Sequence, residues 1–191
     1  ISMDKKQFLD KYFSELKSLI NFDEKEIDKI ILTSEILIEA SKKGKKTLIF
    51  GNGGSAAIAS HFSVDITKNA GVRCVNFNEP DLLTCFSNDY GYEKWVEKSI
   101  EFYGDKDDIA IFISASGTSR NMLNGAKKAR EKKFNKIITL SGNKINNELS
   151  KLGDINFWVN SEAYNLVENT HQIILLSLVD LIRGKSVYSP N

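Results

Sequence analysis

Apolar residues recur at helical spacing throughout the first 44 residues of the chain. From Asp4 to Ile20, spacings of three and four residues place large apolar side chains on one helical stripe. The stripe consists of Phe8, Tyr12, Phe13, Leu16, Leu19 and Ile20. A second helix is expected to begin at Asp23, with Glu26 in the capping-box position, and to end at Gly44. Two amphipathic helices therefore precede the first strand, where they either cover a sheet or form a subunit interface.

From residue 45 onward, short apolar runs alternate with helical segments. The expected strands are 47–50, 73–77, 108–114, 136–142 and 155–159. Helices are expected to run up to about Asn69, over 92–104, up to about Lys133 and from about Ala163 to Arg183. Apolar strands that alternate with helices are typical of a parallel sheet covered on both faces. The pattern predicts an α/β fold with a five-stranded parallel sheet in a single domain over 1–191, with leading helices over 1–44 and the sheet core over 45–191.

Charge and composition narrow the possible partners. The chain has 26 basic and 25 acidic residues, a net charge of +1 and no long basic run. We therefore expect neither nucleic acid nor an anionic membrane as a partner. No apolar run reaches the length of a membrane span. Cys74 and Cys85 form no C-x-x-C motif and are expected to be buried, reduced thiols, which fits a cytoplasmic protein.

Two strand ends carry sequences rich in serine and glycine. GNGGS (51–55) follows the first strand, and SASGTSRN (114–121) follows the third. In parallel α/β sheets, ligands bind beyond the carboxyl ends of the strands, where glycines let the backbone approach an anion. The helix that follows directs its free N–H groups at that anion. Serine and glycine also simply cap helices at such turns, but two of these turns in one sheet favour a site for a phosphomonoester.

The first turn also fits the dinucleotide-binding pattern G-x-G-x-x-G/A over 51–56. That pattern requires an acidic residue at the end of the next strand, and Glu79 comes too late for this role. Two helices ahead of the first strand also do not suit an N-terminal dinucleotide-binding unit. Phosphate binding is therefore the preferred interpretation.

The chain has two histidines, and each lies near an acidic residue on a predicted helix. His61 and Asp65 are four residues apart, and Glu168 and His171 are three apart, so each pair shares a helix face. Taken alone, each pair is best interpreted as a helical ion pair. Together with a phosphate site, they could form a divalent-metal or acid–base site.

Three motifs carry a resemblance to a known family. With GNGGSAAIASHF (51–62), NDYGY (88–92) and ISASGTSRN (113–121), the sequence resembles the phosphoheptose isomerases of the SIS (sugar isomerase) fold. The resemblance covers essentially the whole chain, including a final helix of the form E-N-x-H. It implies interconversion of sedoheptulose 7-phosphate and D-glycero-D-manno-heptose 7-phosphate, or of a close phosphosugar. It also implies a homotetramer with one zinc ion per subunit.

The resemblance assigns roles to individual residues. The residues that match the family's substrate-binding positions are Asn52, Gly53, Gly54, Ser55, Asn88, Asp89, Ser114, Ala115, Ser116, Ser119 and Glu168. His61, Asp65 and Glu168 match the metal ligands, and Asp65 and Glu168 are the expected catalytic acid–base groups.

The chain also departs from the family pattern. Asp65, Glu168 and Ala115 stand where the family usually has Glu, Gln and Thr, and Asn165 replaces a common Asp. Leu176 stands in place of a catalytic histidine. Isomerisation needs a base and a group that stabilises the enediolate, and leucine supplies neither. We expect an isomerase with reduced or altered catalysis; the alternative is a non-catalytic sugar-phosphate sensor or protein-binding scaffold, like the DnaA-initiator-associating protein, which also lacks the second histidine.

Overall fold

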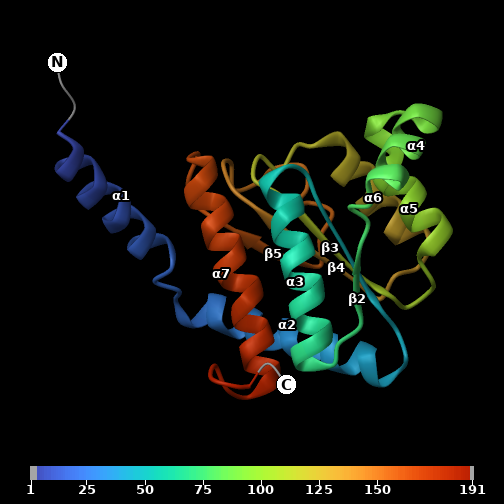
Figure 1. Cartoon of the computed structure of the whole chain (residues 1–191), viewed down its shortest axis with the longest axis horizontal. Coiled ribbons are helices and arrows are strands. Elements are labelled where there is room, and N and C mark those ends of the chain that lie inside the picture. The colour runs from blue at the N-terminus through green and yellow to red at the C-terminus, as the bar shows by residue number, and fades with distance from the viewer. Residues whose placement is uncertain (1–3, 190–191) are drawn as a thin grey trace.

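The structure is a computed structural model that describes residues 4–189. In these residues, five parallel strands form one sheet in the order β2-β1-β3-β4-β5 (Figure 1). The strands are β1 (Thr47–Gly51), β2 (Cys74–Asn76), β3 (Ile109–Ser114), β4 (Lys136–Ser141) and β5 (Ile155–Trp158). The α/β fold and the five-stranded parallel sheet expected from the sequence are confirmed. The order places β1 and β3 next to each other in the middle of the sheet.

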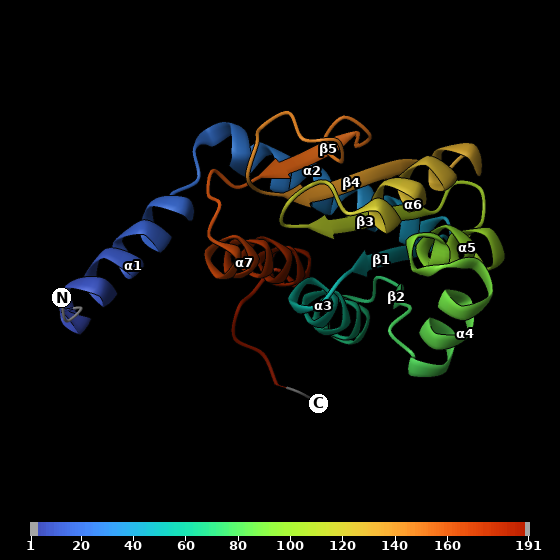
Figure 2. The same cartoon turned by 90° about the horizontal axis from the view of Figure 1, so that it is seen from above.

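Strand β3 shows why the strands are apolar along their whole length. Ile109, Ile111 and Ile113 pack into a core shared with α2 (Glu24–Lys42), α3 (Gly54–Ala70) and α7 (Tyr164–Arg183). Ala110 and Phe112 pack into a second core shared with α5 (Trp95–Tyr103) and α6 (Arg120–Glu131). Because helices cover both faces, both sides of a strand need apolar side chains. Figure 2 shows α3 and α7 side by side along one side of the sheet.

Helix α1 (Lys5–Leu19) is the first helix expected from the sequence, and it projects away from the sheet and its covering helices (Figures 1 and 2). Within the described chain, none of its side chains is buried. Phe8, Leu9 and Phe13 are 51%, 49% and 52% exposed. The apolar stripe of this helix is therefore largely uncovered in the single chain.

Helix α4 (Pro80–Tyr90) is not predicted from the sequence. Among the described residues, none of its side chains is fully buried, but Leu82, Leu83 and Phe86 share one face of the helix and pack against the second core. This short stripe and Pro80 at the first turn, where proline is favoured, are the signals that could have found it. Cys85 lies exposed on α4, whereas Cys74 is buried, and both thiols are free. The expectation of two buried thiols is therefore wrong for Cys85.

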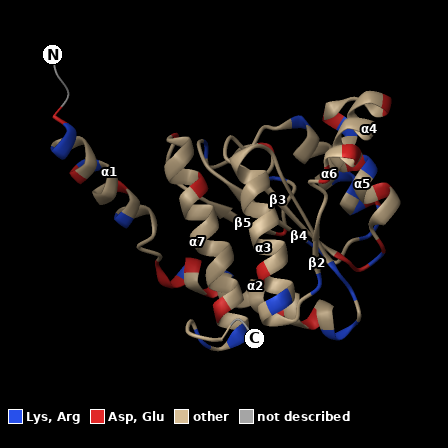
Figure 3. Cartoon of the chain, in the orientation of Figure 1, with Lys and Arg blue, Asp and Glu red and all other residues tan. Residues whose placement is uncertain are grey.

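Charged residues of both signs are interspersed over the elements, as Figure 3 shows. This distribution agrees with the net charge of +1. Over residues 4–189, no helix is both long enough and apolar enough to span a bilayer.

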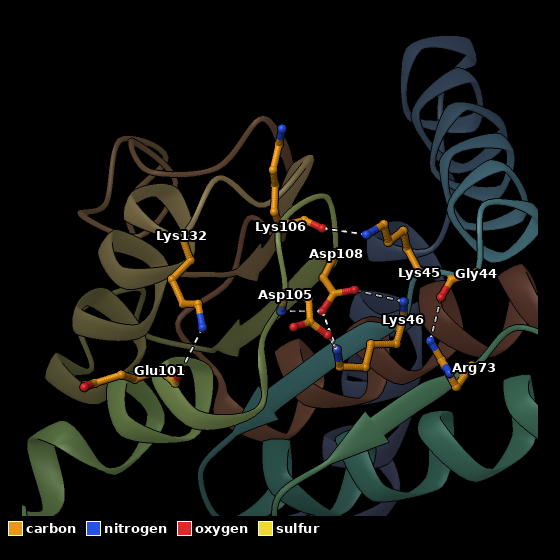
Figure 4. Close-up of polar contacts among 9 residues, drawn as sticks. All are labelled: Gly44, Lys45, Lys46, Arg73, Glu101, Asp105, Lys106, Asp108 and Lys132. Atoms are coloured by element: carbon orange, nitrogen blue, oxygen red, sulfur yellow. Dashed lines mark hydrogen bonds and ion pairs between the residues drawn. The ribbon is translucent and has the colours of Figure 1, made fainter.

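A buried ion pair joins the amino ends of β1 and β3 (Figure 4). The Lys46 ammonium lies 2.7 Å from the carboxylates of Asp108 and Asp105, whose side chains are 1% and 74% exposed. Asp108 also accepts the backbone N–H groups of Lys46 at 3.1 Å and Asp105 at 2.8 Å. Burial works against the charged ammonium, but the hydrogen bonds to the two carboxylates raise the pKa of Lys46. Three donors thus satisfy the buried carboxylate where the two central strands begin.

Asp108→Asn is expected to destabilise the protein by about 3 kcal/mol or more, because a neutral amide replaces the buried carboxylate that three donors satisfy and leaves Lys46 with only the exposed carboxylate of Asp105. The matched control is Asp105→Asn, which removes the exposed carboxylate of the same cluster and should cost at most about 1 kcal/mol. Urea unfolding of the three proteins at pH 7 measures the difference. Equal losses in the two variants would contradict this account of the cluster.

Candidate functional site

The carboxyl ends of β1 and β3 place the two serine- and glycine-rich turns side by side. Gly51, at the end of β1, pairs with Ile113, the residue before Ser114. A cavity of about 90 Å³ lies between the turns. It is lined by Asn52, Ser55, Ile113, Ser114, Ala115, Ser116, Ser119, Tyr164 and Glu168. The structure therefore brings together residues of both turns that the sequence assigned to substrate binding, together with Glu168 from the last helix.

Glycines shape the first turn. A Cβ on Gly51 would lie 2.5 Å from backbone atoms of Ser55, so no other residue allows so tight a turn. Gly53, with φ +55°, is the N-cap of α3 and makes no side-chain cap hydrogen bond. No side chain therefore caps α3, and the N–H groups of Ser55 and Ala56 donate to the carbonyls of Asn52 and Gly53 at 2.9 and 3.0 Å. The positive end of the helix dipole nevertheless suits an anion at this turn. Ser55, 4% exposed, adds a hydroxyl in the first turn of the helix.

Hydroxyl groups dominate the second turn. The Ser114 hydroxyl donates to the Ser119 hydroxyl at 3.1 Å and accepts the Gly117 N–H at 3.2 Å. Ser116 accepts from the backbone N–H and the hydroxyl of Thr118, at 3.2 and 3.0 Å. Ser119 is the N-cap of α6 but makes no side-chain cap hydrogen bond. Because hydroxyls rotate, those of Ser114 and Ser119 can turn from each other to the oxygens of a bound anion.

Glu168 brings a carboxylate to the cavity. It comes from α7 and packs against Gly54 at the start of α3, where a Cβ would overlap the carboxylate. Glycine at position 54 therefore permits this close approach of the two helices. Tyr164 lies one turn earlier on α7, is 59% exposed and also lines the cavity. The site thus combines hydroxyl groups with one carboxylate.

Two residues that the sequence analysis did not assign to the site hold Asn52 in place. The side-chain amides of Asn52 and Asn121 exchange hydrogen bonds of 3.0 and 2.8 Å. Tyr92 donates its hydroxyl to Asn52 Oδ1 at 2.9 Å. Tyr92 belongs to the NDYGY motif and Asn121 to the ISASGTSRN motif. Both motifs stand out in the sequence, but only the folded chain shows which of their side chains reach Asn52.

His61 and Asp65 do not line the cavity. They lie about two and three turns beyond Gly54 along α3, roughly 10 and 16 Å at the rise of a helix. His61 is exposed, and Asp65 accepts a hydrogen bond from the Asn69 amide at 2.7 Å. Among the described residues, no group of three His, Cys, Asp or Glu side chains could hold a metal ion. The single chain therefore does not assemble His61, Asp65 and Glu168 into the ligand set that the resemblance implies.

Asn88 and Asp89 lie exposed in the last turn of α4. The Asn88 amide donates to the Asp89 carboxylate at 2.9 Å, and neither side chain lines the cavity. The structure thus leaves the NDYGY acid and amide outside the cavity, on the exposed surface of α4.

His171 lies one turn beyond Glu168 on α7 and is completely buried. Its Nε2–H donates to the Ser141 carbonyl at 3.0 Å. Burial lowers the pKa of His171 to about 4, although this hydrogen bond acts in the opposite direction. The ring is therefore neutral near pH 7 and forms no ion pair with Glu168. Leu176, further along the same helix, packs against the core and exposes no polar atom to the site.

Known proteins resemble this chain over most of its length. Residues 11–142 match the model of the SIS domain. A phosphoheptose isomerase 1 from Campylobacter jejuni is 32% identical over 182 residues, covering 91% of this chain and 96% of the relative. A phosphoheptose isomerase from Buchnera aphidicola is 30% identical over 188 residues, covering 94% and 96%.

Solved structures show the same fold. A phosphoheptose isomerase from Neisseria gonorrhoeae superposes with a TM-score of 0.84 at 25% identity, covering 94% of this chain and 98% of the other. One from Francisella tularensis gives a TM-score of 0.83 at 24% identity, covering 96% and 100%. The SIS-type arrangement expected from the resemblance is therefore confirmed.

The hydroxyls of Ser114 and Ser119 are expected to bind phosphate. Each hydrogen bond to a charged group contributes about 1.5–3 kcal/mol, so removing each hydroxyl should weaken binding about tenfold or more. Titration calorimetry with inorganic phosphate would compare the wild type with the Ser114→Ala/Ser119→Ala variant. Ser177→Ala, an exposed serine at the far end of α7, serves as the control. Unchanged affinity in the double variant would place the anion elsewhere.

Proposed function

The chain belongs to the phosphoheptose isomerase family of the SIS fold, and we propose that it interconverts sedoheptulose 7-phosphate and D-glycero-D-manno-heptose 7-phosphate or a closely related phosphosugar. One observation carries the proposal: the cavity between the two turns joins four serines to one carboxylate. A phosphosugar isomerase needs an anchor for the phosphate and a group that moves a proton. Relatives that are named phosphoheptose isomerase support the same class of reaction.

The serines and the helix N-termini would anchor the phosphate. Ser55, Ser114, Ser116 and Ser119 converge on a volume of about 90 Å³, which suits a phosphate group but not a whole sugar. The carbon chain would therefore extend out of the cavity past Glu168. Because phosphate and carboxylate repel each other, the carboxylate would face the sugar rather than the phosphate.

Glu168 is the proposed base. Its carboxylate would remove a proton from the carbon next to the carbonyl, and the electron pair of that C–H bond would form the C=C bond of an enediolate. The proton would then return to the neighbouring carbon, while a hydroxyl proton moves between the two oxygens, so that ketose and aldose interconvert. The glutamine usual at this position cannot act as a base, whereas a carboxylate can. Asp65, the other expected catalytic group, lies too far along α3 to share this role within one chain.

Zinc remains a separate proposal. An imidazole and two carboxylates are ligands that zinc accepts, but His61, Asp65 and Glu168 are not gathered in the single chain. The steps that we propose for Glu168 therefore involve side chains of this chain alone. The proposal of one zinc ion per subunit is tested by measuring activity with and without added zinc.

One observation favours a second candidate function. Leu176 packs against the core in the place of a family histidine, so the site lacks one imidazole. A SIS protein that binds a sugar phosphate without converting it, as a sensor or a protein-binding scaffold, would need the serines but not the acid–base group. Glu168, which the scaffold would not need, favours the enzyme.

We also propose that the protein is a homotetramer. The stripe of α1 leaves Phe8 and Phe13 about half exposed, and a cavity of about 430 Å³ lies between α1 and the start of α7. An isolated monomer would expose this apolar surface to water, whereas α1 helices of neighbouring subunits would cover it.

A cytoplasmic location also belongs to this proposal, since the substrate class is an intermediate of carbohydrate metabolism.

The wild type is expected to show weak isomerase activity in a coupled assay with sedoheptulose 7-phosphate, and zinc is expected to raise it. Glu168→Gln should lower kcat by about 10²–10⁴-fold, because it removes the proposed base. Leu176→His should raise the rate or the affinity for zinc. Glu162→Gln, an exposed carboxylate just before α7, is the matched control and should leave the rate unchanged.

The assay also separates the two functions. If the wild type has no turnover even with zinc, and Leu176→His gains it, the scaffold interpretation is correct. Full activity in Glu168→Gln would show that another group is the base, and Asp65 would then be the next candidate.

Light scattering at micromolar concentration is expected to give a tetramer. Phe8→Asp/Phe13→Asp should dissociate it, because charged groups would then lie in the proposed interface. Phe102→Asp is the control, since Phe102 is also exposed, at 56%, but lies on α5. A monomeric wild type, or equal effects of both variants, would refute the role of α1.

A further inference from the structure

The NDYGY motif contacts Asn52, which lines the cavity, through its second tyrosine rather than through its amide and acid. Tyr92 begins the short turn η1 (Tyr92–Lys94), which lies between α4 and α5. Gly91 before it has φ +90° and ψ 146°, a conformation that favours glycine. The turn is attached to α6, because the Asn124 amide donates to the Glu93 carbonyl at 2.9 Å. These two features hold Tyr92 where its hydroxyl meets Asn52.

The orientation of the Asn121 amide follows from a backbone donor. The Met122 N–H can only donate, and it lies 3.0 Å from one side-chain atom of Asn121, which must therefore be the oxygen. Asn121 is 3% exposed, so this arrangement is shielded from water. Its Nδ2 then donates to Asn52 Oδ1, and its Oδ1 accepts from Asn52 Nδ2.

The Asn121 amide and the Tyr92 hydroxyl fix the orientation of the Asn52 amide. Its oxygen accepts two hydrogen bonds, from Asn121 at 2.8 Å and from the Tyr92 hydroxyl at 2.9 Å. Its nitrogen has two N–H groups, of which one donates to Asn121 at 3.0 Å. Over the described chain, no acceptor meets the second N–H of Asn52. Since Asn52 lines the cavity, this N–H is available to a ligand there.

We propose that Tyr92 is a positioning residue for the anion cavity, and that its hydroxyl holds the Asn52 amide so that the free N–H donates to a bound phosphate. The inference rests on the proposed phosphosugar site but does not require catalysis. Tyr92 acts through Asn52 and does not itself line the cavity. It thereby couples the α4–α5 connection to phosphate binding between β1 and β3.

A double-mutant cycle with inorganic phosphate tests this inference. The four proteins are the wild type, Tyr92→Phe, Asn52→Ala and the double variant, each titrated by calorimetry. Tyr92→Phe removes only a hydroxyl and is expected to weaken phosphate binding about 2- to 10-fold, the effect of one hydrogen bond. In the Asn52→Ala background, Tyr92→Phe should have no further effect, because the group through which it acts is gone.

A spectroscopic readout accompanies the titration. In the wild type, the side-chain amide signals of Asn52 in a ¹⁵N–¹H spectrum should shift when phosphate is added. In Tyr92→Phe this shift should be smaller at saturating phosphate, because the amide is less well oriented. A role of Tyr92 in stability alone would leave the shift at saturation unchanged.

The control is Tyr103→Phe, a half-exposed tyrosine on α5, which should bind phosphate as the wild type does. The inference is overturned if Tyr92→Phe binds phosphate normally, or if its effect is the same with and without Asn52. Phosphate binding without isomerase turnover would refute the proposed activity and leave this inference standing. A wild type that binds no phosphate would overturn the proposed anion site and this inference together.

Discussion

The pairing of β1 with β3 is the constraint on which the site depends. The two strands are neighbours in register, with Gly51 opposite Ile113, so the turns that follow them leave the sheet at adjacent points. The cavity is lined by residues of both turns, together with Tyr164 and Glu168 of α7. The buried pair of Asp108 and Lys46 holds the opposite ends of the same strands. A change in this register would separate the serines of one turn from the glycines of the other.

The close approach of two helices brings the carboxylate of Glu168 to the cavity. Helices α3 and α7 lie side by side, and Gly54 has no side chain that would keep Glu168 away from the cavity. His171, neutral and buried, attaches the same helix to the end of β4 through the Ser141 carbonyl. The position of Glu168 therefore depends on packing between segments that are far apart in the sequence, not on its neighbours along α7.

The departures from the family pattern have a structural consequence within one chain. His61 and Asp65 follow the axis of α3 away from the cavity, and Leu176 belongs to the core. What remains at the cavity is a set of serine hydroxyls with one carboxylate. In the function that we propose, the hydroxyls would anchor the phosphate and the carboxylate would be the one proton-transfer group.

The sequence by itself determined the parallel sheet, its covering helices and the two serine- and glycine-rich turns, because periodicity and glycine or serine chemistry are local properties. It did not lead to the prediction of α4, because a helix of 11 residues gives only a short apolar stripe. It also could not show that Asn88 and Asp89 lie outside the cavity while Tyr92 and Asn121 reach Asn52. Those contacts join segments separated by dozens of residues, and their geometry follows from strand order and helix packing, which only the tertiary structure decides.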